Sequence, residues 1–326
     1  MIVVIGAAGT IGRTACAFLD TWGAEYARRD FRLEGEEHVD VRDPSGLVTA
    51  LAGASVCVNC ADYRFNLDAM EGALAAGSHY VDLGGLFHTT RLQLDLGPRF
   101  LAAGSTAVLG MGSAPGKTNL LAKAAVARLG EEPRSLEIWA ATRDPAAADH
   151  PFPITYSAQT LVEELTRPPM VLTGGELREA EPLSGRAERE LPELGRVEAI
   201  YTLHSELATL PEAFPSLEEA SFRLSLPAGL VEKLLALGED ERPEPYVQSE
   251  QAVAVHLVEV LGESRSITGA AVTRGGSARS TSEPAARAAV ELAEGRVDKP
   301  GAHPPESAID DPEAFLALLD TDVRWQ

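Results

Sequence analysis

The segment Gly6–Gly12, within the opening run "MIVVIGAAGTIG", has three glycines at the spacing G-x-x-G-x-x-G. The apolar residues before it predict a strand that ends at Gly6, and the apolar spacing after it predicts a helix from about Thr10 to Trp22. At such a turn Gly9 leaves room for a pyrophosphate, and Gly12 lets the helix pack closely on the sheet. We therefore predict a dinucleotide site here, made by Gly6, Gly9, Thr10, Ile11 and Gly12. The alternative is a glycine-rich turn that serves packing alone.

Strands and helices alternate beyond this turn. Further strands are predicted near residues 24–27 and 38–41 and in "SVCVNCA", "HYVDLGG" and "TAVLGM". The helices between them include "DPSGLVTALAG", which Asp43 is placed to cap, and a segment near Leu92 to Ala103. Strands separated by helices of this length indicate parallel β-α-β units with helices on both faces. The sequence therefore predicts an α/β fold with a Rossmann-type, doubly wound parallel sheet.

The end of the second predicted strand bears on the choice of dinucleotide. An acid at this place usually holds the adenosine ribose of NAD, whereas basic residues suit the 2′-phosphate of NADP. Here the chain reads Ala27-Arg28-Arg29-Asp30. Guanidinium groups bind a phosphate dianion through paired hydrogen bonds, so Arg28 and Arg29 favour NADP. NAD stays possible if the strand runs two residues longer and ends beside Asp30, and the two arginines then form an ordinary surface pair.

The stretch "LGMGSAPGKTN", residues 109–119, superficially matches the phosphate-binding loop of nucleoside triphosphatases because it ends in Gly116-Lys117-Thr118. That loop requires G-x-x-x-x-G-K-[ST], and the place of its first glycine is taken here by Met111. Pro115 also removes one of the backbone N–H donors that would surround a phosphate. We therefore do not expect an ATP or GTP site, and the loop needs another role.

Composition restricts the kinds of partner. The chain has 326 residues, 45% of them hydrophobic, and a formal net charge of −21. Such a charge repels nucleic acid, and no basic stripe compensates for it. No apolar run reaches about 18 residues, so no membrane span is expected. The chain enters its first strand without a basic leader, which argues against a signal peptide. We expect a cytoplasmic protein that acts on small molecules.

Two of the three cysteines, Cys57 and Cys60, form a C-x-x-C. The surrounding "ASVCVNCA" reads as a buried strand, in which residues three apart point to opposite faces. No second C-x-x-C or nearby histidine pair would complete a zinc site. We therefore predict structural cysteines, no metal and a reducing compartment.

The middle of the chain has a different character. The segments "SLEIWAAT", "RVEAIYTLHS", "EASFRLSL", "QAVAVHLVEV" and "SITGAAVT" read as strands, several with period-two alternation. Helices are predicted near 157–165 and 229–237, and the chain after residue 276 becomes helical again, with a Pro-rich connector "PGAHPPES" before a last helix near 312–319. We predict a discontinuous dinucleotide-binding domain, residues 1–118 and 277–326. Residues 119–276 form a second α/β domain with a mixed sheet.

Several long motifs resemble the saccharopine dehydrogenase-like group, which includes saccharopine reductases, carboxynorspermidine dehydrogenases and lysine 6-dehydrogenases. The resemblance covers most of the chain. It runs through "VNCADYRFNLDAMEGALAAGSHYVDLGG", "AGSTAVLGMGSAPGKTN", "TYSAQTLVEELTRPPMVLTGGELREAEPLSG", "YTLHSELATLPEAFPSL" and "EPAARAAVELAEGRVDKPGAHPPESAIDDPEAFLALL". The loop "GSAPG" is most similar to that of lysine 6-dehydrogenases, which have a small residue before Pro-Gly. Saccharopine reductases carry an aspartate where this chain has Ala114, and lysine 6-dehydrogenases have small residues where it has His204 and Glu206.

The resemblance implies an NAD(P)-dependent oxidoreductase that transfers hydride at a C–N bond of an amino acid or imine, in a protein that forms homodimers. It also implies that the Pro-Gly loop lies beside the nicotinamide, so Gly112 and Pro115 are assigned to the cofactor, together with Asn59 and Ala61. Gly116 and Asn119 are assigned to the substrate. The alternative is a dinucleotide-binding protein without turnover, such as a redox-responsive or degenerate relative.

Amine oxidation needs a base, and a substrate carboxylate needs a cation. The candidate acid–base residues within the motifs are His204, Glu206, Asp82 and Tyr156. His204 titrates near neutrality, and Asp82 follows a strand at its C-terminal end, where α/β proteins bind ligands. Alternatively, His204 is a packed strand residue and Asp82 a turn or cap acid. Arg143 and Arg274 are candidates for the carboxylate, with simple surface placement as the alternative.

Overall fold

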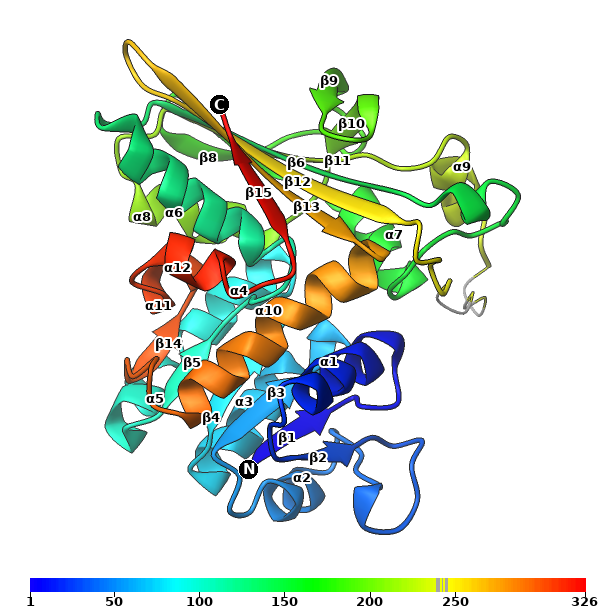
Figure 1. Ribbon diagram of the computed structural model, residues 1–326, viewed down its shortest axis with the longest axis vertical. Helices are drawn as coiled ribbons and strands as arrows, with labels where there is room; N and C mark the ends of the chain where they lie inside the picture. Colours follow the sequence, from blue (N-terminus) through cyan, green and yellow to red (C-terminus); the bar gives the residue numbers. More distant parts are fainter. Residues whose placement is uncertain (239–240, 242, 244–245) are drawn as a thin grey trace. The chain divides into compact units, whose positions relative to one another are not determined.

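The computed structural model describes residues 1–238, 241, 243 and 246–326. Contacts divide the chain into two compact units, whose elements are labelled in Figure 1. Unit 1 consists of Met1–Gly116 and Thr281–Asp311, and unit 2 of Lys117–Ser280 and Pro312–Gln326. The tail is therefore divided, whereas the sequence analysis assigned all of 277–326 to the first domain.

The described residues of unit 1 form one six-stranded sheet. Its strands are β1 (Ile2–Ile5), β2 (Tyr26–Arg29), β3 (Val56–Asn59), β4 (His79–Asp82), β5 (Thr106–Val108) and β14 (Gly301–His303). Their order is β14-β5-β4-β3-β1-β2, and every neighbouring pair is parallel. Because β1 lies between β3 and β2, the chain winds outward from β1 in both directions, which is the doubly wound topology. The predicted Rossmann-type sheet is confirmed.

The helices of unit 1 follow the predicted alternation. They are α1 (Thr10–Thr21), α2 (Pro44–Ala50), α3 (Asn66–Ala76), α4 (Phe87–Leu94), α5 (Gly97–Ala103) and α11 (Pro305–Ala308), with short 3-10 turns η1 (Gly35–Glu37) and η2 (Tyr63–Phe65). α10 (Gly276–Ala293) begins in unit 2 and continues in unit 1. The Asp43 carboxylate accepts a hydrogen bond from the Ser45 N–H and caps α2, as its position in the sequence suggested.

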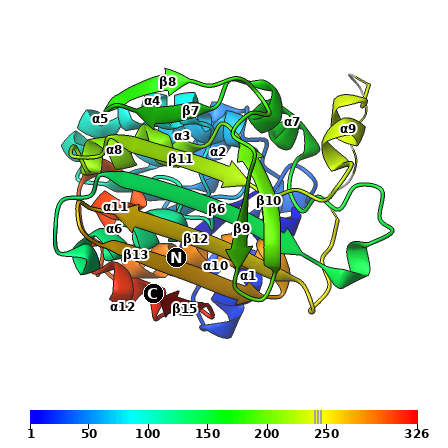
Figure 2. The same ribbon diagram turned by 90° about the horizontal axis from the view of Figure 1, so that it is seen from above.

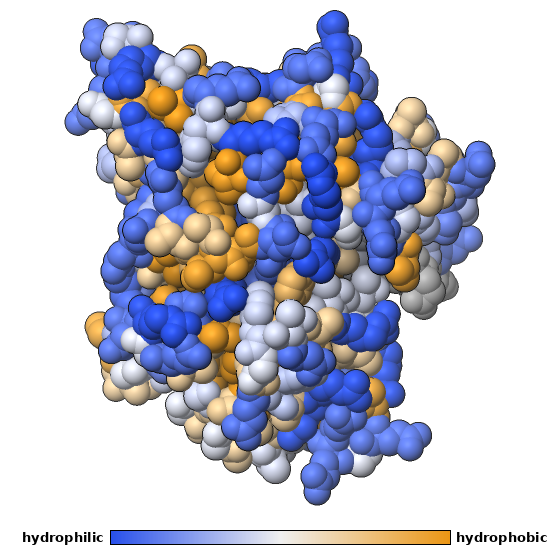
Figure 3. All heavy atoms as spheres, in the orientation of Figure 1, coloured by the Kyte–Doolittle hydropathy of each residue, from blue (hydrophilic) through white to orange (hydrophobic). Residues whose placement is uncertain are grey.

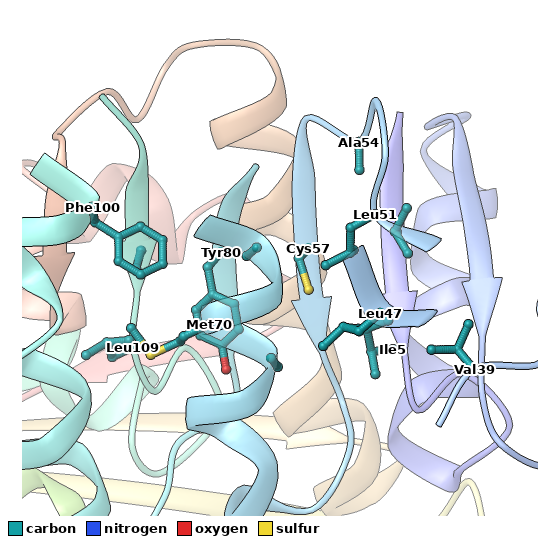
Figure 4. Close-up of a cluster of buried hydrophobic side chains, with 14 residues drawn as sticks. Ile5, Val39, Leu47, Leu51, Ala54, Cys57, Met70, Tyr80, Phe100 and Leu109 are labelled. Carbon is teal, nitrogen blue, oxygen red and sulfur yellow. The ribbon is translucent and has the colours of Figure 1, made fainter. Parts of the chain in front are cut away.

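One hydrophobic core lies against the sheet of unit 1, and Figure 4 shows its side chains. Ile5, Cys57, Tyr80 and Leu109 project into it from the strand region, and Met70 comes from α3. Cys57 is fully buried, and burial raises the pKa of its thiol to about 12. A thiol in this setting packs as a small apolar group.

Four parts of unit 1 differ from the sequence-based prediction. The single helix predicted near residues 92–103 is two helices, α4 and α5. β2 ends at Arg29, two residues later than predicted, so both arginines belong to the strand. The strand predicted at 38–41 is reduced to a single bridge between Asp30 and His38. The Pro-rich connector contains β14, which pairs with β5 and forms the edge of the sheet. A strand this short has too few residues to display a periodic pattern.

Unit 2 is built on a mixed sheet, as predicted. Its strands are β6 (Ser135–Arg143), β7 (Met170–Thr173), β8 (Glu176–Glu179), β9 (Ala187–Leu191), β10 (Gly195–Tyr201), β11 (Glu219–Leu224), β12 (Val253–Leu261), β13 (Ser266–Arg274) and β15 (Asp322–Trp325). The main order is β15-β13-β12-β6-β11-β10-β9, with β7 and β8 attached beside β11. The β6–β11 pair is parallel, whereas β12 pairs antiparallel with both β6 and β13. In Figure 2, β9 and β10 cross over these strands, and a buried cluster fills the space beneath them.

The remaining elements of unit 2 complete its packing. They are α6 (Lys117–Leu129), α7 (Ala158–Thr166), α8 (Leu210–Ala213), α9 (Leu230–Leu235) and α12 (Pro312–Leu316), with 3-10 turns η3 (Pro145–Ala147) and η4 (Ser205–Ala208). α6 packs against β12 and β13, and α12 packs against α6. The C-terminal strand β15 pairs with β13, which explains why the last residues belong to unit 2.

The surface agrees with the acidic composition. Most of the face drawn in Figure 3 carries hydrophilic residues, with apolar residues in smaller groups. A search of the described residues found no helix long and apolar enough to cross a membrane.

Candidate functional site

The glycine turn between β1 and α1 has the geometry that a pyrophosphate requires. Gly6 has a φ of +75°, and a Cβ there would lie 2.7 Å from the backbone nitrogen of Ala61. A Cβ on Gly12 would lie 2.2 Å from the Gly6 carbonyl oxygen, so helix and strand meet without space for a side chain. Gly9 precedes α1, and no side chain among the described residues caps this helix. The first N–H groups of α1 are therefore available to a phosphate.

The charged residues at the end of β2 lie beside this turn. Arg28 donates two hydrogen bonds to the Glu37 carboxylate, at 3.1 and 3.0 Å. Arg29 donates to the Arg28 carbonyl at 2.8 Å. Asp30 immediately follows the strand, and its carboxylate accepts from the Ala8 N–H at 3.0 Å. The sequence analysis left NAD possible if β2 ran two residues longer and ended beside Asp30. In the structure β2 ends at Arg29, so this condition is met.

Asn59 and Ala61, both assigned to the cofactor, form the turn after β3. The Asn59 amide donates to Asn66 at 2.9 Å and accepts from the Ala61 N–H at 3.1 Å. Asn59 is 1% exposed, so its side chain supports the turn. The backbone of Ala61, together with that of Cys60, lies against Gly6.

Asp82, a candidate acid–base residue, holds the Pro-Gly loop. Its side chain is fully buried and accepts from the N–H groups of Gly84 and Gly110, at 2.9 and 2.6 Å. Tyr80 and Gln93 donate to its other oxygen. Burial raises the pKa of Asp82, although the Gly110 N–H and the other donors act to lower it. A carboxylate enclosed in this way positions backbone, so the structure supports the turn-acid alternative over a catalytic role.

The Pro-Gly loop itself is closely packed within unit 1. A Cβ added to Gly84 would lie 2.5 Å from Cγ of Pro115, and one added to Gly110 would lie 2.9 Å from the same atom, so the ring leaves no space for a side chain at either glycine. The Gly112 N–H donates to the Pro115 carbonyl, and Gly116 has a φ of +121° with no space for a Cβ against Gly112. The loop therefore depends on its glycines for shape, and Gly116 has no side chain with which to bind a substrate.

Lys117 and Thr118, which suggested a phosphate-binding loop, are fully buried at the start of α6. The Lys117 ammonium donates to the hydroxyl groups of Thr273 and Ser280, at 2.7 and 2.6 Å. Thr118 donates to Glu206 at 2.7 Å. Both side chains therefore serve the interior of unit 2, which agrees with the absence of the triphosphatase spacing in the sequence.

A chain of three hydrogen-bonded residues in unit 2 includes His204. Glu206 is fully buried; one of its oxygens accepts from Thr118, and the other lies 2.5 Å from Nδ1 of His204. The Phe222 ring stacks on the His204 ring with centroids 3.8 Å apart. Among the described residues, Nε2 of His204 has no hydrogen-bond partner. A carboxylate on Nδ1 orients an imidazole so that Nε2 can exchange a proton with a ligand.

Charge around His204 favours its protonated form. Burial alone would lower the pKa of the imidazole, but the carboxylate of Glu206, and then that of Glu164, raise it above its ordinary value. The buried His256, by contrast, has a pKa well below its ordinary value because of burial and the nearby charges of Lys117 and His204. The pKa values of these two histidines are thus shifted in opposite directions, and of the two only His204 is paired with a carboxylate.

Tyr156 and Glu164 form a second hydrogen-bonded pair near His204. The Tyr156 hydroxyl donates to Glu164 at 2.9 Å. Burial raises the pKa of Glu164 to about 7, with His204 and Tyr156 acting against this shift. Burial and the adjacent Glu164 raise the pKa of Tyr156 well above its ordinary value. Tyr156 is thus a hydrogen-bond donor to Glu164 rather than a base.

A backbone hydrogen bond between two segments of unit 2 brings Glu164 close to His204 and Glu206. α7 places Leu161, Glu164 and Leu165 on its buried side. The Leu203 N–H donates to the Glu164 carbonyl at 3.0 Å, which joins the segment after β10 to α7. His204 then precedes η4, which carries Glu206.

Of the other predicted substrate residues, Asn119 adjoins this hydrogen-bonded chain, because its amide oxygen accepts from Thr118 at 3.5 Å. The two arginines lie elsewhere in unit 2. Asn119 is 1% exposed, and its amide lies 3.5 Å from the Thr209 hydroxyl. Arg143 is exposed at the end of β6. The Arg274 side chain is 66% exposed and forms an ion pair with Glu193. For both arginines, the structure supports the surface alternative.

Three residues of this site escaped the sequence analysis. Glu164 had a signal, because a glutamate on the apolar side of an amphipathic helix is unusual. Thr118 was noticed only as part of Gly116-Lys117-Thr118, and Phe222 had no signal, since the partners of both are distant in sequence. No group of three or more potential metal ligands was found among the residues that the structure describes.

We expect Glu164 to make the protein's stability depend on pH. Its folded-state pKa of about 7 exceeds the ordinary 4.5, so the folded state binds the proton more tightly. Its contribution is fully present below pH 4.5 and is lost as the pH rises through 7. A shift of this size corresponds to about 3 kcal/mol. The stability of Glu164→Gln relative to the wild type should therefore be about 3 kcal/mol greater at pH 8 than at pH 4, measured by urea unfolding at both pH values.

The matched control is Glu163→Gln on the same helix, a residue that forms an ion pair with Arg167. Its stability should follow the wild-type pH profile. If both variants gave parallel profiles, Glu164 would not carry the buried proton.

Comparison with known proteins agrees with this architecture. Residues 29–108 match the family described as "Saccharopine dehydrogenase NADP binding domain". This match begins at the end of β2 and ends with β5, so it lies within unit 1. Together with the glycine turn and the doubly wound sheet, this match makes unit 1 similar to the NAD(P)-binding domains of that family.

Similar solved structures include proteins that align with this chain over most of both chains. Apo saccharopine dehydrogenase (L-Glu forming) from Saccharomyces cerevisiae has a TM-score of 0.69 at 14% identity, covering 100% of this chain and 99% of that one. Homospermidine synthase from Legionella pneumophila, solved with NAD, has a TM-score of 0.73 at 11% identity, covering 100% of this chain and 90% of that one. DAP dehydrogenase of C. glutamicum, solved with DAP, has a TM-score of 0.50 at 14% identity, covering 97% of this chain and 94% of that one. At these identities the likeness establishes the shared fold.

Proposed function

We propose that this protein is an NAD(P)-dependent oxidoreductase that transfers hydride at a C–N bond of an amino acid or imine, with NADP as the preferred cofactor. One observation carries the proposal: the chain Thr118–Glu206–His204, which leaves Nε2 of His204 without a partner among the described residues. An NAD(P)-binding domain in the same chain supports the redox part of the proposal.

The proposed chemistry suits this arrangement. When bound, the nicotinamide accepts or supplies a hydride. An amine can lose hydride from its carbon only when its nitrogen is neutral, so an ammonium substrate must first give up a proton. Nε2 of His204 takes that proton, and the Glu206 carboxylate stabilises the imidazolium that results. In the reverse direction, the imidazolium returns the proton to nitrogen.

The pKa shift of His204 agrees with this role. A general base works best when its pKa lies near the working pH. Burial would depress the histidine pKa, and Glu206 and Glu164 counter that effect. The arrangement therefore keeps the imidazole able to hold a proton in a buried setting.

The substrate class follows from the resemblance to lysine- and saccharopine-processing enzymes and from two departures. Ala114 replaces the aspartate of saccharopine reductases, and His204 with Glu206 replaces the small residues of lysine 6-dehydrogenases. We therefore infer that the substrate is an amino-acid-derived amine or imine other than lysine and saccharopine.

A substrate panel tests the proposal. The purified protein is incubated with NADP⁺ or NAD⁺ and a set of diamino acids and their secondary-amine conjugates, with lysine and saccharopine included. The absorbance of the reduced nicotinamide reports turnover. Turnover of at least one amine, and none with the hydroxy-acid analogues, is the expected result. Cofactor binding without turnover of any amine, or of any imine in the reverse direction, would instead favour a non-catalytic dinucleotide-binding protein.

A further inference from the structure

The residues that follow β2 bear on which dinucleotide unit 1 accepts. The Asp30 carboxylate accepts four hydrogen bonds: from the N–H groups of Ala8 and Arg32, and from Nε and Nη2 of the Arg32 guanidinium, at 2.9 to 3.0 Å. A carboxylate offers about four acceptor positions. Its side chain is only 1% exposed. Asp30 therefore has neither the acceptor capacity nor the accessibility to bind the ribose 2′-hydroxyl of NAD.

Arg32 has the opposite properties. Its side chain is 49% exposed. Its Nη2 atom would lie 3.3 Å from a Cβ on Gly9, the glycine at the N-terminus of α1. The bidentate pair with Asp30 fixes the guanidinium plane at this point, and Asp30 is itself tied to Ala8 in the glycine turn. Arg32 is therefore held beside the turn that binds the dinucleotide phosphates.

Arg28 and Arg29 are placed differently. Arg28 forms a bidentate ion pair with Glu37, and both side chains are more than 40% exposed. Arg29 turns back along the strand to the Arg28 carbonyl. Among the described residues, the hydrogen bonds of these two guanidinium groups go to Glu37 and to the Arg28 carbonyl, whereas Arg32 approaches Gly9 closely.

We propose that Arg32, positioned by Asp30, selects NADP by binding the adenosine 2′-phosphate, and that Asp30 acts as a support for Arg32 and not as a ribose acceptor. The proposal rests on the dinucleotide binding that is part of the proposed function, and it replaces Arg28 and Arg29 with Arg32 as the discriminating residue. A planar guanidinium with several donors matches a phosphate dianion, and ribose without the phosphate gives it no partner of like strength.

Binding measurements test this assignment without any substrate. Fluorescence titration gives dissociation constants for NADPH and NADH with the wild type, Arg32→Ala, and the double variant Arg28→Ala/Arg29→Ala. The wild type should prefer NADPH. Arg32→Ala should weaken NADPH binding by about ten- to a hundredfold, the usual effect of losing a charge-assisted hydrogen bond. NADH binding should stay the same or tighten, because Asp30 regains acceptor capacity. The double variant should keep the wild-type ratio.

Arg32→Ala leaves a buried carboxylate without its partner and can destabilise unit 1. Arg32→Ala with Asp30→Asn removes both charges together and should also lose the NADPH preference, and circular dichroism verifies folding of each variant. The assignment is overturned by a wild-type preference for NADH, by equal weakening of both cofactors in the folded Arg32 variants, or by a changed ratio in the double arginine variant alone. A wild-type preference for NADH would also overturn the NADP preference stated in the proposed function. Each outcome leaves the hydride-transfer part of that proposal standing, because that part fails only if a bound cofactor is never turned over.

Discussion

His204→Gln should lower the turnover number by about 10²–10⁴-fold, the usual contribution of a general acid–base residue. Glutamine cannot take the proton that Nε2 of His204 accepts, but it retains a similar length and polarity. The affinity for NADPH, which belongs to unit 1, should not change. The pH profile should also lose its limb near neutrality. The measurement is steady-state kinetics against pH, with the amine or imine that the panel identifies.

Glu206→Gln provides the matched comparison. Glu206 raises the pKa of His204, so loss of its charge should move the limb of the profile to lower pH while the limb itself persists. A rise in KM for His204→Gln with little change in kcat would mean that His204 only orients the substrate. In that case the acid–base assignment would have to be abandoned.

Gly9→Asp should abolish dinucleotide binding while the protein still folds. Gly9 has a φ of −74°, which any residue adopts, and its Cβ would meet nothing closer than 3.3 Å. A carboxylate at the N-terminus of α1 would occupy the place of the pyrophosphate and repel it. Juxtaposed like charges cost several kcal/mol, which is at least about a hundredfold in affinity. Fluorescence titration with NADPH measures the loss, and the thermal unfolding temperature verifies the fold.

Gly9→Ala separates charge from size, because it adds the Cβ alone. We expect it to bind NADPH more weakly than the wild type and far better than Gly9→Asp. Gly12→Ala is a contrasting case, since its Cβ would lie 2.2 Å from the Gly6 carbonyl and should disturb the packing itself. Undiminished affinity in a folded Gly9→Asp variant would remove the glycine turn from the proposed cofactor site.

Local sequence patterns were sufficient for the architecture. The glycine spacing at Gly6, Gly9 and Gly12 predicted the first β-α turn, and the alternation of apolar segments predicted the doubly wound sheet. The long strands β6, β12 and β13 were also predicted close to their observed bounds. These features depend on residues near one another in the chain, so periodicity reports them directly.

Short elements were less predictable. β7, β8, β9, β14 and β15 were missed, and β2 ended two residues later than expected. Each of these strands is five residues or fewer and lies at or near a sheet edge. Their pairing partners, rather than their own patterns, determine whether they form.

The candidate site shows the same division. The sequence alone identified His204, Glu206 and Tyr156 as candidates, because ionisable and hydroxyl side chains within specific motifs are visible in one dimension. Only the tertiary structure decided that Thr118 holds Glu206, that Glu164 retains its proton up to about pH 7, and that Asp82 supports a loop. It also placed Arg32, and not Arg28, beside Gly9. The sequence gives the chemical type of each residue. Its protonation and its hydrogen-bond partner depend on burial and on contacts with groups distant in the chain, and these form only when the chain folds.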